Sequence, residues 1–380
     1  MAKDILFLNL INGCNLACDY CLVRKDREEM SLKTMLTSLD YFLDANKGLL
    51  HIDFFSCESM LRFDLIKEAV EYCKPRANKD QLLSFSIITN GTLFDDKKLD
   101  FIEKHPEVCL TISLDGTEES HNCHRKYKDG RGTFKDTIKY IDRLVDMNTV
   151  FSLVVSSETA GRLMENIAFL NSLGCKKLIL QFAVTQQGWT KNGVDTASDQ
   201  LRRLAHFYFD NMRPNGGMDI FLIDFMVKTL ERRREIDTPS DFERIVCSTL
   251  RRERAISVSP SGKVYPCLGL SSLADDNFCI GRVDDTVRLG GEECFYRKIL
   301  PGFTENYSNG ICRSCAVRDF CYLRGCPVVR IAGLFDDMVF SRIKGMNMVC
   351  ELYRLLFREV KEVYRVSFRE SVLNAMTAPL

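Results

Sequence analysis

Short apolar runs alternate with amphipathic stretches through the first half of the chain. Six runs rich in β-branched and aromatic residues predict strands over residues 4–9, 50–55, 84–88, 108–113, 150–155 and 177–182. Between the first two, apolar residues recur at helical spacing from Leu32 to Leu43, after an N-cap at Ser31 and before a stop at Gly48. Strands that alternate with helices are typical of repeated βα units around a parallel sheet.

The number of these units limits the fold class. A second helical pattern, from Phe134 to Val145, follows the fourth predicted strand. Six βα units are too few to close an eight-fold barrel, so we expect an α/β fold with a partial (β/α)6 barrel and its chemistry at the C-terminal strand ends. The composition divides the chain into a barrel core over 1–182, a helical connector over 183–246, a cysteine-rich domain over 247–355 and a helical tail over 356–380.

Composition and charge exclude several classes of protein. The chain has 380 residues, of which 52 are basic and 52 acidic, so no overall field favours nucleic acid or an anionic membrane. No run of eighteen apolar residues occurs, and the N-terminus has too short an apolar stretch for a signal peptide. We therefore expect a cytoplasmic protein. Seventeen cysteines in a reducing compartment indicate metal ligation rather than a disulfide framework.

Three cysteines follow the first predicted strand in a C-x3-C-x2-C loop, at Cys14, Cys18 and Cys21. Three thiolates hold three irons of a [4Fe–4S] cluster and leave the fourth iron without a protein ligand. An open iron can chelate the amino and carboxylate groups of S-adenosylmethionine, whose reductive cleavage gives a 5′-deoxyadenosyl radical. A zinc knuckle is the alternative, but zinc normally needs a fourth ligand and no His or Cys occurs between Leu22 and Leu50.

The triad and the segments after it resemble the radical S-adenosylmethionine superfamily. These segments read FFSCESML, SIITNGTL, TISLDG, GRGTF and KLILQF. The resemblance implies four cofactor contacts: Tyr20 at the adenine, Glu58 at the methionine amino group, Ser113 at the ribose and Arg125 at the carboxylate. Of the family's Gly-Gly-Glu-Pro motif only Glu58 is retained, because Ser56, Cys57 and Ser59 replace the other residues. A plain strand-end turn before Gly116 is the alternative role for Ser113 and Asp115.

The C-terminal region holds a second set of cysteines. Cys247 is followed by AISVSPSGKVYPC, which predicts a hairpin of two short strands that presents Cys267 at its end. ICRSCAVRDFCYLRGCP then supplies Cys312, Cys315, Cys321 and Cys326, and Cys350 comes last. This order resembles the SPASM domain, with one extra residue between Cys321 and Cys326. A zinc-ribbon-like module that uses four of these cysteines is the alternative.

The SPASM resemblance implies two auxiliary clusters, and so three [4Fe–4S] clusters in total. It assigns Cys312, Cys315, Cys321 and Cys350 to the outer cluster, and Cys247, Cys267 and Cys326 to the inner one. The fourth ligand of the inner cluster stays open between Cys279, Cys294 and a substrate thiolate.

SPASM enzymes mostly cross-link, epimerise or oxidise side chains of peptides and proteins. This sequence resembles the anaerobic sulfatase-maturating type, in which an aspartate after the hairpin cysteine acts as a base in formylglycine formation. Leu268 stands at that position and cannot take a proton, which disfavours this activity. We assign no catalytic base.

The expected function is therefore a radical peptide or protein maturase, with thioether formation as the first choice of modification. Its expected partners are a peptide or protein substrate and an electron donor such as flavodoxin or ferredoxin. Because the chain begins almost at its first predicted strand, we expect a leader peptide to bind the barrel, the connector or a separate protein. The alternatives are a formylglycine-generating dehydrogenase of the anaerobic sulfatase-maturating type and a small-molecule radical dehydrogenase. A further alternative is an electron-transfer or zinc scaffold that binds no S-adenosylmethionine.

Overall fold

The fold is built on one ten-stranded sheet in the order β10-β9-β8-β1-β2-β3-β4-β5-β6-β7. It is seen in a computed structural model that describes residues 3–21, 27–55, 57–147, 149–183, 188–232, 255–273, 278–283 and 346–377. The central strands are β1 Lys3–Leu8, β2 Gly48–Phe54, β3 Gln81–Thr89, β4 Val108–Ser113, β5 Val150–Val155 and β6 Lys177–Phe182. They pair in parallel in sequence order. The six predicted strands and the α/β partial-barrel class are therefore confirmed.

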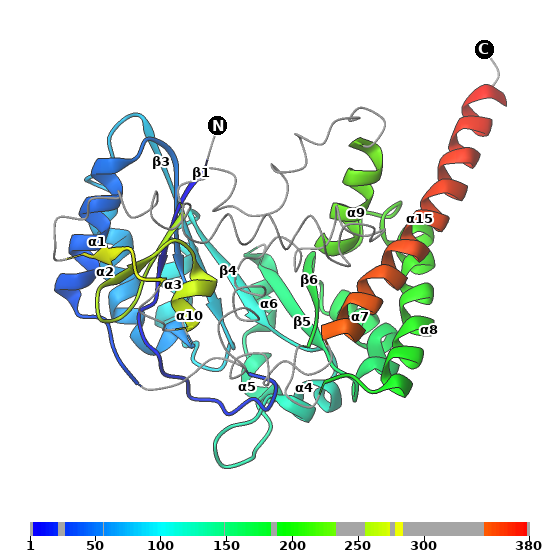
Figure 1. The fold of residues 1–380 in the computed structure, drawn as a ribbon, viewed down its shortest axis with the longest axis horizontal. Helices are drawn as coiled ribbons and strands as arrows, with labels where there is room; N and C mark the ends of the chain where they lie inside the picture. The colour runs from blue at the N-terminus through cyan, green and yellow to red at the C-terminus, as the bar shows by residue number, and fades with distance from the viewer. Residues whose placement is uncertain are drawn as a thin grey trace.

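Helices follow the strands and bury one face of the sheet (Figure 1). They are α1 Leu32–Ala45, η1 Ser59–Arg62, α2 Phe63–Cys73, α3 Asp96–Glu103, α4 Glu118–His124, α5 Phe134–Thr137, α6 Ile141–Asp146, η2 Ala160–Arg162 and α7 Leu163–Ser172. Burial alternates along the second half of β2, so Leu50, Ile52 and Phe54 join helix residues such as Leu39 in one core. The opposite face of the sheet is half-exposed and carries polar residues.

Two helix predictions need correction at their ends. Ser31 is the N-cap of α1, since its Oγ accepts a hydrogen bond from Thr34 N at 3.0 Å. The helix stops at Ala45 rather than running to Gly48, because the Asn46 side chain donates to Phe42 O at 2.7 Å and closes the last turn. Gly48, with φ +85°, instead begins β2.

The second predicted helix is two short ones, α5 and α6. The break follows Thr137, whose hydroxyl donates to Thr133 O at the N-cap of α5 and also to Asn90 O after β3, at 3.0 and 3.2 Å. This side chain fixes α5 to the carboxyl end of β3, and the chain bends before α6 begins at Ile141.

The connector and the predicted hairpin both extend the sheet. The connector contains α8 Lys191–Phe207, η3 Tyr208–Met212, β7 Asp219–Ile220 and α9 Phe221–Arg232. Strand β7 pairs with β6, and β8 Ala255–Val258 pairs in parallel with β1. The hairpin is confirmed, since β8 pairs antiparallel with β9 Lys263–Tyr265, which pairs with β10 Gly281–Arg282. Its first strand thus belongs to the same sheet as the barrel.

The C-terminal helix is longer than the expected tail. Helix α15 runs from Met346 to Thr377, so Cys350 lies in its first turns. It packs along α8 and α9, as Figure 1 shows, and Tyr353 meets Phe182 of β6 edge to face at 5.1 Å. This helix therefore closes the β6 side of the core. Within the described ranges, no helix has the length and apolar character needed to cross a membrane.

Candidate functional site

The three cysteines of the predicted triad lie in the loop that leaves the carboxyl end of β1. Cys14 and Cys18 are half-buried and Cys21 is exposed, all as free thiols. The backbone N–H of Leu16 donates to Cys14 Sγ at 3.3 Å, a contact that favours a thiolate. In the described part of the chain, no three His, Cys, Asp or Glu side chains converge around one metal ion. A donor set of three thiols on one loop instead fits a cubane cluster with one open iron.

Side chains at the end of β3 hold the start of this loop. Asn90 Nδ2 donates to Asn15 Oδ1 at 2.9 Å, and Asn15 Nδ2 donates to Thr92 Oγ1 at 2.8 Å. Asn90 and Thr92 follow β3 and the cysteine loop follows β1. Because these strands are parallel, their carboxyl ends lie at the same edge of the sheet.

A buried carboxylate holds the other end of the loop. Asp115, two residues after β4, accepts from Tyr20 Oη at 2.6 Å and from Arg125 Nε and Nη2 at 2.8 and 3.2 Å. It also accepts from the backbone N–H of Val154 on β5 at 2.9 Å. Arg125 lies over the Tyr20 ring, 5.4 Å from its centroid. The predicted cofactor residues Tyr20 and Arg125 are therefore brought together by a residue that we assigned only to a turn.

The charges of this network stabilise one another. Burial opposes ionisation of Asp115, but Arg125 and the hydrogen bonds keep the pKa of its carboxyl below the usual value. Burial raises the pKa of Tyr20 well above its usual value. The pKa of Arg125 is raised despite its burial, by Asp115 first and by Tyr20 and the Cys18 thiol next. A buried Asp–Arg ion pair thus sits beside the second cysteine of the triad.

The turn after Asp115 also requires glycine, so the turn role and the ion-pair role coexist. Gly116 has φ +98°, and a Cβ there would lie 2.3 Å from the side chain of Asn166.

His121 supports the network from α4. Its Nδ1 accepts from Asp115 N at 3.3 Å, so the proton is on Nε2, which donates to Thr133 Oγ1 at 2.9 Å. Thr133 Oγ1 in turn donates to Arg125 O at 3.1 Å. Burial, and then Arg125, lower the pKa of His121 to about 3. The ring is therefore neutral and fixed in one tautomer.

This neutral histidine predicts a loss of stability in weak acid. The unfolded chain binds a proton at a His pKa of about 6.5, whereas folded His121 does so only near 3. The contribution of neutral His121 to the free energy of unfolding is complete above the unfolded pKa. It is lost as the pH falls from that value toward the folded pKa, by about 2 kcal/mol at pH 5.

Urea unfolding at about pH 7 and about pH 5 measures this loss. The free energy of unfolding of His121→Asn should fall less between the two pH values than that of wild type, whereas the exposed control His206→Asn should fall as much as wild type. An equal fall for His121→Asn and wild type would contradict the assignment.

A second histidine of α4 fixes the cysteine loop between Cys18 and Tyr20. His124 Nδ1 donates to Asp19 Oδ1 at 2.7 Å, and its Nε2 contacts Ser156 Oγ at 2.7 Å. Ser156 follows β5, so the loop is tied to the carboxyl ends of β3, β4 and β5 together.

Glu58, predicted to contact the methionine amino group, is fully buried. Its Oε1 accepts from Met60 N at 3.1 Å and Thr89 Oγ1 at 2.7 Å, and its Oε2 accepts from Asn90 N at 2.7 Å. Burial raises the pKa of its carboxyl. Both oxygens therefore link η1 to the end of β3, and the residue braces the strand end that positions Asn90.

Ser113, the predicted ribose contact, is the last residue of β4 and is half-buried. It pairs in register with Ser152 of β5. Within the described residues, the hydroxyls of Thr111, Ser113 and Ser152 have no hydrogen-bond partner in the chain, so this polar strand face is available to a ligand.

The cysteines of the C-terminal set are only partly described. Cys247, Cys312, Cys315, Cys321 and Cys326 lie outside the described residues, as does Cys294. Cys267 follows β9, immediately before α10 Leu268–Leu273. Cys267 and Cys279 both pack against the small cluster of Tyr265, Leu270 and Phe278. Cys279 and Cys267 therefore border the same small hydrophobic cluster.

Sequence reasoning missed Asp115, His121 and His124 as functional supports. A signal was present: Asp115 precedes a glycine, and His121 and Arg125 follow four residues apart, one helical turn. That spacing places both side chains on the side of α4 that faces the strand end.

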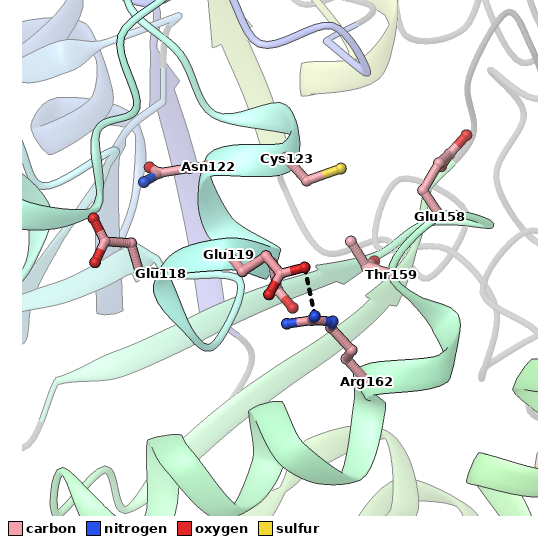
Figure 2. A pocket seen from close by; sticks show the side chains of 8 residues that line it. Glu118, Glu119, Asn122, Cys123, Glu158, Thr159 and Arg162 are labelled. Atoms are coloured by element: carbon pink, nitrogen blue, oxygen red, sulfur yellow. Dashed lines mark ion pairs between the residues drawn. The ribbon is translucent and has the colours of Figure 1, made fainter.

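An open pocket of about 530 Å³ lies between α4 and η2. Figure 2 shows Cys123 directed toward Glu158, and Arg162 paired with Glu119. Burial and then Glu158 and Asp19 raise the pKa of Cys123. The thiol is held protonated, so the pocket offers no cysteine nucleophile.

Comparisons with known proteins agree with this geometry. The model of the Radical SAM superfamily matches residues 8–170. An uncharacterized protein of Methanocaldococcus jannaschii is 32% identical over 176 residues, which are 46% of this chain and 60% of that protein's length. The serine-type anaerobic sulfatase-maturating enzyme of Klebsiella aerogenes is 24% identical over 96% of this chain and 86% of its own. The structure of native anSMEcpe with bound AdoMet and Cp18Cys peptide has the same fold, with a TM-score of 0.75, 19% identity and coverage of 97% and 99% of the two chains.

Proposed function

We propose that this chain, whose residues 8–170 match the Radical SAM superfamily, modifies a side chain of a peptide or protein, with its radical-forming cluster on Cys14, Cys18 and Cys21. The single observation that carries the proposal is the three-thiol loop held at the carboxyl ends of β3, β4 and β5 by Asn90, Asp115 and Ser156. S-adenosylmethionine and a [4Fe–4S] cluster are the cofactors that the superfamily implies.

When bound, these cofactors supply a 5′-deoxyadenosyl radical that abstracts a hydrogen atom from the substrate. The chain's own residues bind and orient. Asp115 takes Nε and Nη2 of Arg125, and within the described residues Nη1 donates no hydrogen bond, which leaves it for the carboxylate of S-adenosylmethionine. The hydroxyl of Tyr20 is fixed by Asp115, so its ring has one orientation for the adenine. Ser113 is the proposed ribose contact, and Glu58 the proposed amino-group contact.

A peptide substrate is supported by two observations. The similar structure of anSMEcpe holds a peptide, and the half-exposed strand face here carries the hydroxyls of Thr111, Ser113 and Ser152. Hydroxyls both donate and accept, so they can pair with peptide N–H and C=O groups. The alternative is a small-molecule radical dehydrogenase.

Thioether formation is the proposed modification. Leu268 begins α10 directly after Cys267, where a formylglycine-forming enzyme needs an aspartate base. Cys247, Cys267 and Cys326 would hold the inner cluster, which would supply an iron site for a substrate cysteine and would lower the pKa of its thiol. Cys279 packs against the same hydrophobic cluster of side chains as Cys267. If Cys279 were the fourth ligand of the inner iron–sulfur cluster, no iron would be open to a substrate thiol.

The test uses the anaerobically reconstituted chain and a Cys-containing candidate peptide. We expect release of 5′-deoxyadenosine and a peptide mass that is lower by two hydrogen atoms, one from the thiol and one from the carbon that bonds to sulfur. The cysteine sulfur should no longer react with iodoacetamide. A variant with Cys14, Cys18 and Cys21 replaced by alanine should still show a change in the spectroscopic signal of the auxiliary clusters when the peptide is added. Efficient formylglycine formation from a sulfatase peptide, or four cysteine ligands on both auxiliary clusters, would contradict the thioether version.

We further propose that residues 247–355 hold two auxiliary clusters, which predicts the metal content. The reconstituted chain should contain about twelve iron and twelve sulfide atoms, four of each per cubane, and about eight after removal of the triad. Elemental analysis and sulfide assay of anaerobic protein measure this directly. Stoichiometric zinc with negligible iron would exclude the clusters.

A further inference from the structure

A basic loop, residues 126–132, lies against the cysteine loop. Ala17 N donates to Lys126 O at 2.8 Å, and Leu16 forms an isolated antiparallel bridge with Tyr127. In Figure 1 the loop projects from the bottom of the view, between α4 and α5 and next to the dark blue cysteine segment. Residues far apart in sequence therefore form one surface around the triad.

The loop has a fixed shape. Lys126 pairs with Gly132 in an antiparallel bridge, Gly130 N donates to Tyr127 O at 3.0 Å, and Arg131 N donates to Asp129 Oδ1 at 3.0 Å. Arg131 also covers the Tyr127 ring, 4.9 Å from its centroid. A surface that is already ordered costs little conformational entropy when a partner binds.

The charge on this surface is positive. Residues 126–136 carry Lys126, Lys128, Arg131 and Lys135 against Asp129 and Asp136. Asp129 pairs with Arg131 at 2.9 Å, and Asp136 accepts from Tyr127 Oη at 2.7 Å, so both carboxylates are engaged. Lys128 and Lys135 are exposed, and neither forms an ion pair within the described ranges. Two lysines are thus free to meet carboxylates of another molecule.

The adjacent cysteine loop reaches solvent at this surface. Ala17, Asp19 and Cys21 are exposed, whereas Cys14, Asn15, Cys18 and Tyr20 are half-buried and Leu16 is buried. Electron tunnelling falls steeply with distance, so a protein that reduces the cluster must dock where a cluster ligand is accessible. The cysteine loop meets that requirement, because Leu16 and Ala17 contact the basic loop and Cys21, four residues after Ala17, is exposed.

We infer that the loop 126–132, together with Lys135 of α5, is the docking surface for an acidic one-electron carrier protein. The inference rests on the proposed cluster at Cys14, Cys18 and Cys21. One electron passes from the reduced carrier to the oxidised cluster, the carrier is left oxidised by one electron, and no proton or bond changes partner. Complementary charges raise association rates by roughly 10- to 1,000-fold, and salt screens the effect.

Charge reversal with a matched control tests the inference. The variant is Lys128→Glu with Lys135→Glu, and the control is Lys47→Glu with Lys79→Glu. Lys47 and Lys79 are exposed at the amino ends of β2 and β3, the opposite edge of the sheet. Stopped-flow absorbance measures cluster reduction by a reduced bacterial flavodoxin, or by dithionite in a parallel series.

At low ionic strength we expect at least about a tenfold slower reduction of the variant by flavodoxin, with the difference removed by salt. Reduction by dithionite and cleavage of S-adenosylmethionine with dithionite should match wild type and control. A second readout is independent of activity: amide signals of 15N-labelled flavodoxin should broaden with wild type and control, but not with the variant.

Three results would overturn the docking surface: equal flavodoxin rates for variant and wild type, an equal loss in the control, or a loss that appears with dithionite as well. Failure of the proposed function is distinguishable, because the wild-type chain would then release no 5′-deoxyadenosine even with dithionite.

Discussion

Replacing Cys14, Cys18 and Cys21 together by alanine is expected to abolish the reductive release of 5′-deoxyadenosine. In the proposed assignment, these three thiols hold the radical-forming cluster on the loop that Asn90, Asp115 and His124 fix at the strand ends. Their removal would take away the open iron proposed to bind S-adenosylmethionine. Anaerobic assays with dithionite and chromatographic detection of 5′-deoxyadenosine measure the effect.

Two controls separate this effect from a general loss of cysteine. Cys175→Ala changes a thiol buried at the amino end of β6, away from the site, and should retain cleavage. Cys312→Ala with Cys315→Ala should retain cleavage and impair turnover of the peptide, or reduce solubility, because metal ligation can contribute folding energy. Continued release of 5′-deoxyadenosine by the triple variant would refute the assignment of the triad.

Replacement of Asp115 by asparagine is expected to have the largest effect on stability among single substitutions. The change keeps the size of the side chain but leaves the Arg125 guanidinium buried without its partner. Removal of one member of a buried ion pair costs about 3–5 kcal/mol of unfolding free energy. It also releases Tyr20, so the KM for S-adenosylmethionine should rise. Urea unfolding and initial-rate kinetics measure the two effects.

Matched variants isolate the ion pair from the hydrogen bond. Tyr20→Phe removes only the phenol hydroxyl and should cost about 2 kcal/mol, the worth of one hydrogen bond to a charged group. Arg125→Met combined with Asp115→Asn should recover part of the stability lost by Asp115→Asn, since no charge is left unpaired. Independent, additive losses in the double variant would show that the two groups do not interact.

Features that depend on neighbours in sequence were predicted well. The six strands, the Ser31 cap and the β8–β9 hairpin follow from apolar spacing and turn residues, which act over a few positions. The thiol loop was found for the same reason, because three cluster ligands lie within eight residues. The end of α1 was misplaced, since the side chain of Asn46 closes the helix two residues before the glycine that we took as its stop.

Tertiary structure alone decided how distant segments meet. Asp115 contacts Tyr20, 95 residues earlier, and Val154, 39 residues later, and no local pattern encodes either contact. Likewise, β8 extends the barrel sheet on β1 although about 250 residues separate the two strands in the chain. The sequence by itself determined which residues we propose to carry the cluster chemistry, because spacing within one loop suffices for that proposal. The surroundings of that loop, including the buried ion pair and the basic loop that contacts Leu16 and Ala17, depend on the parallel register that aligns the carboxyl ends of separate strands.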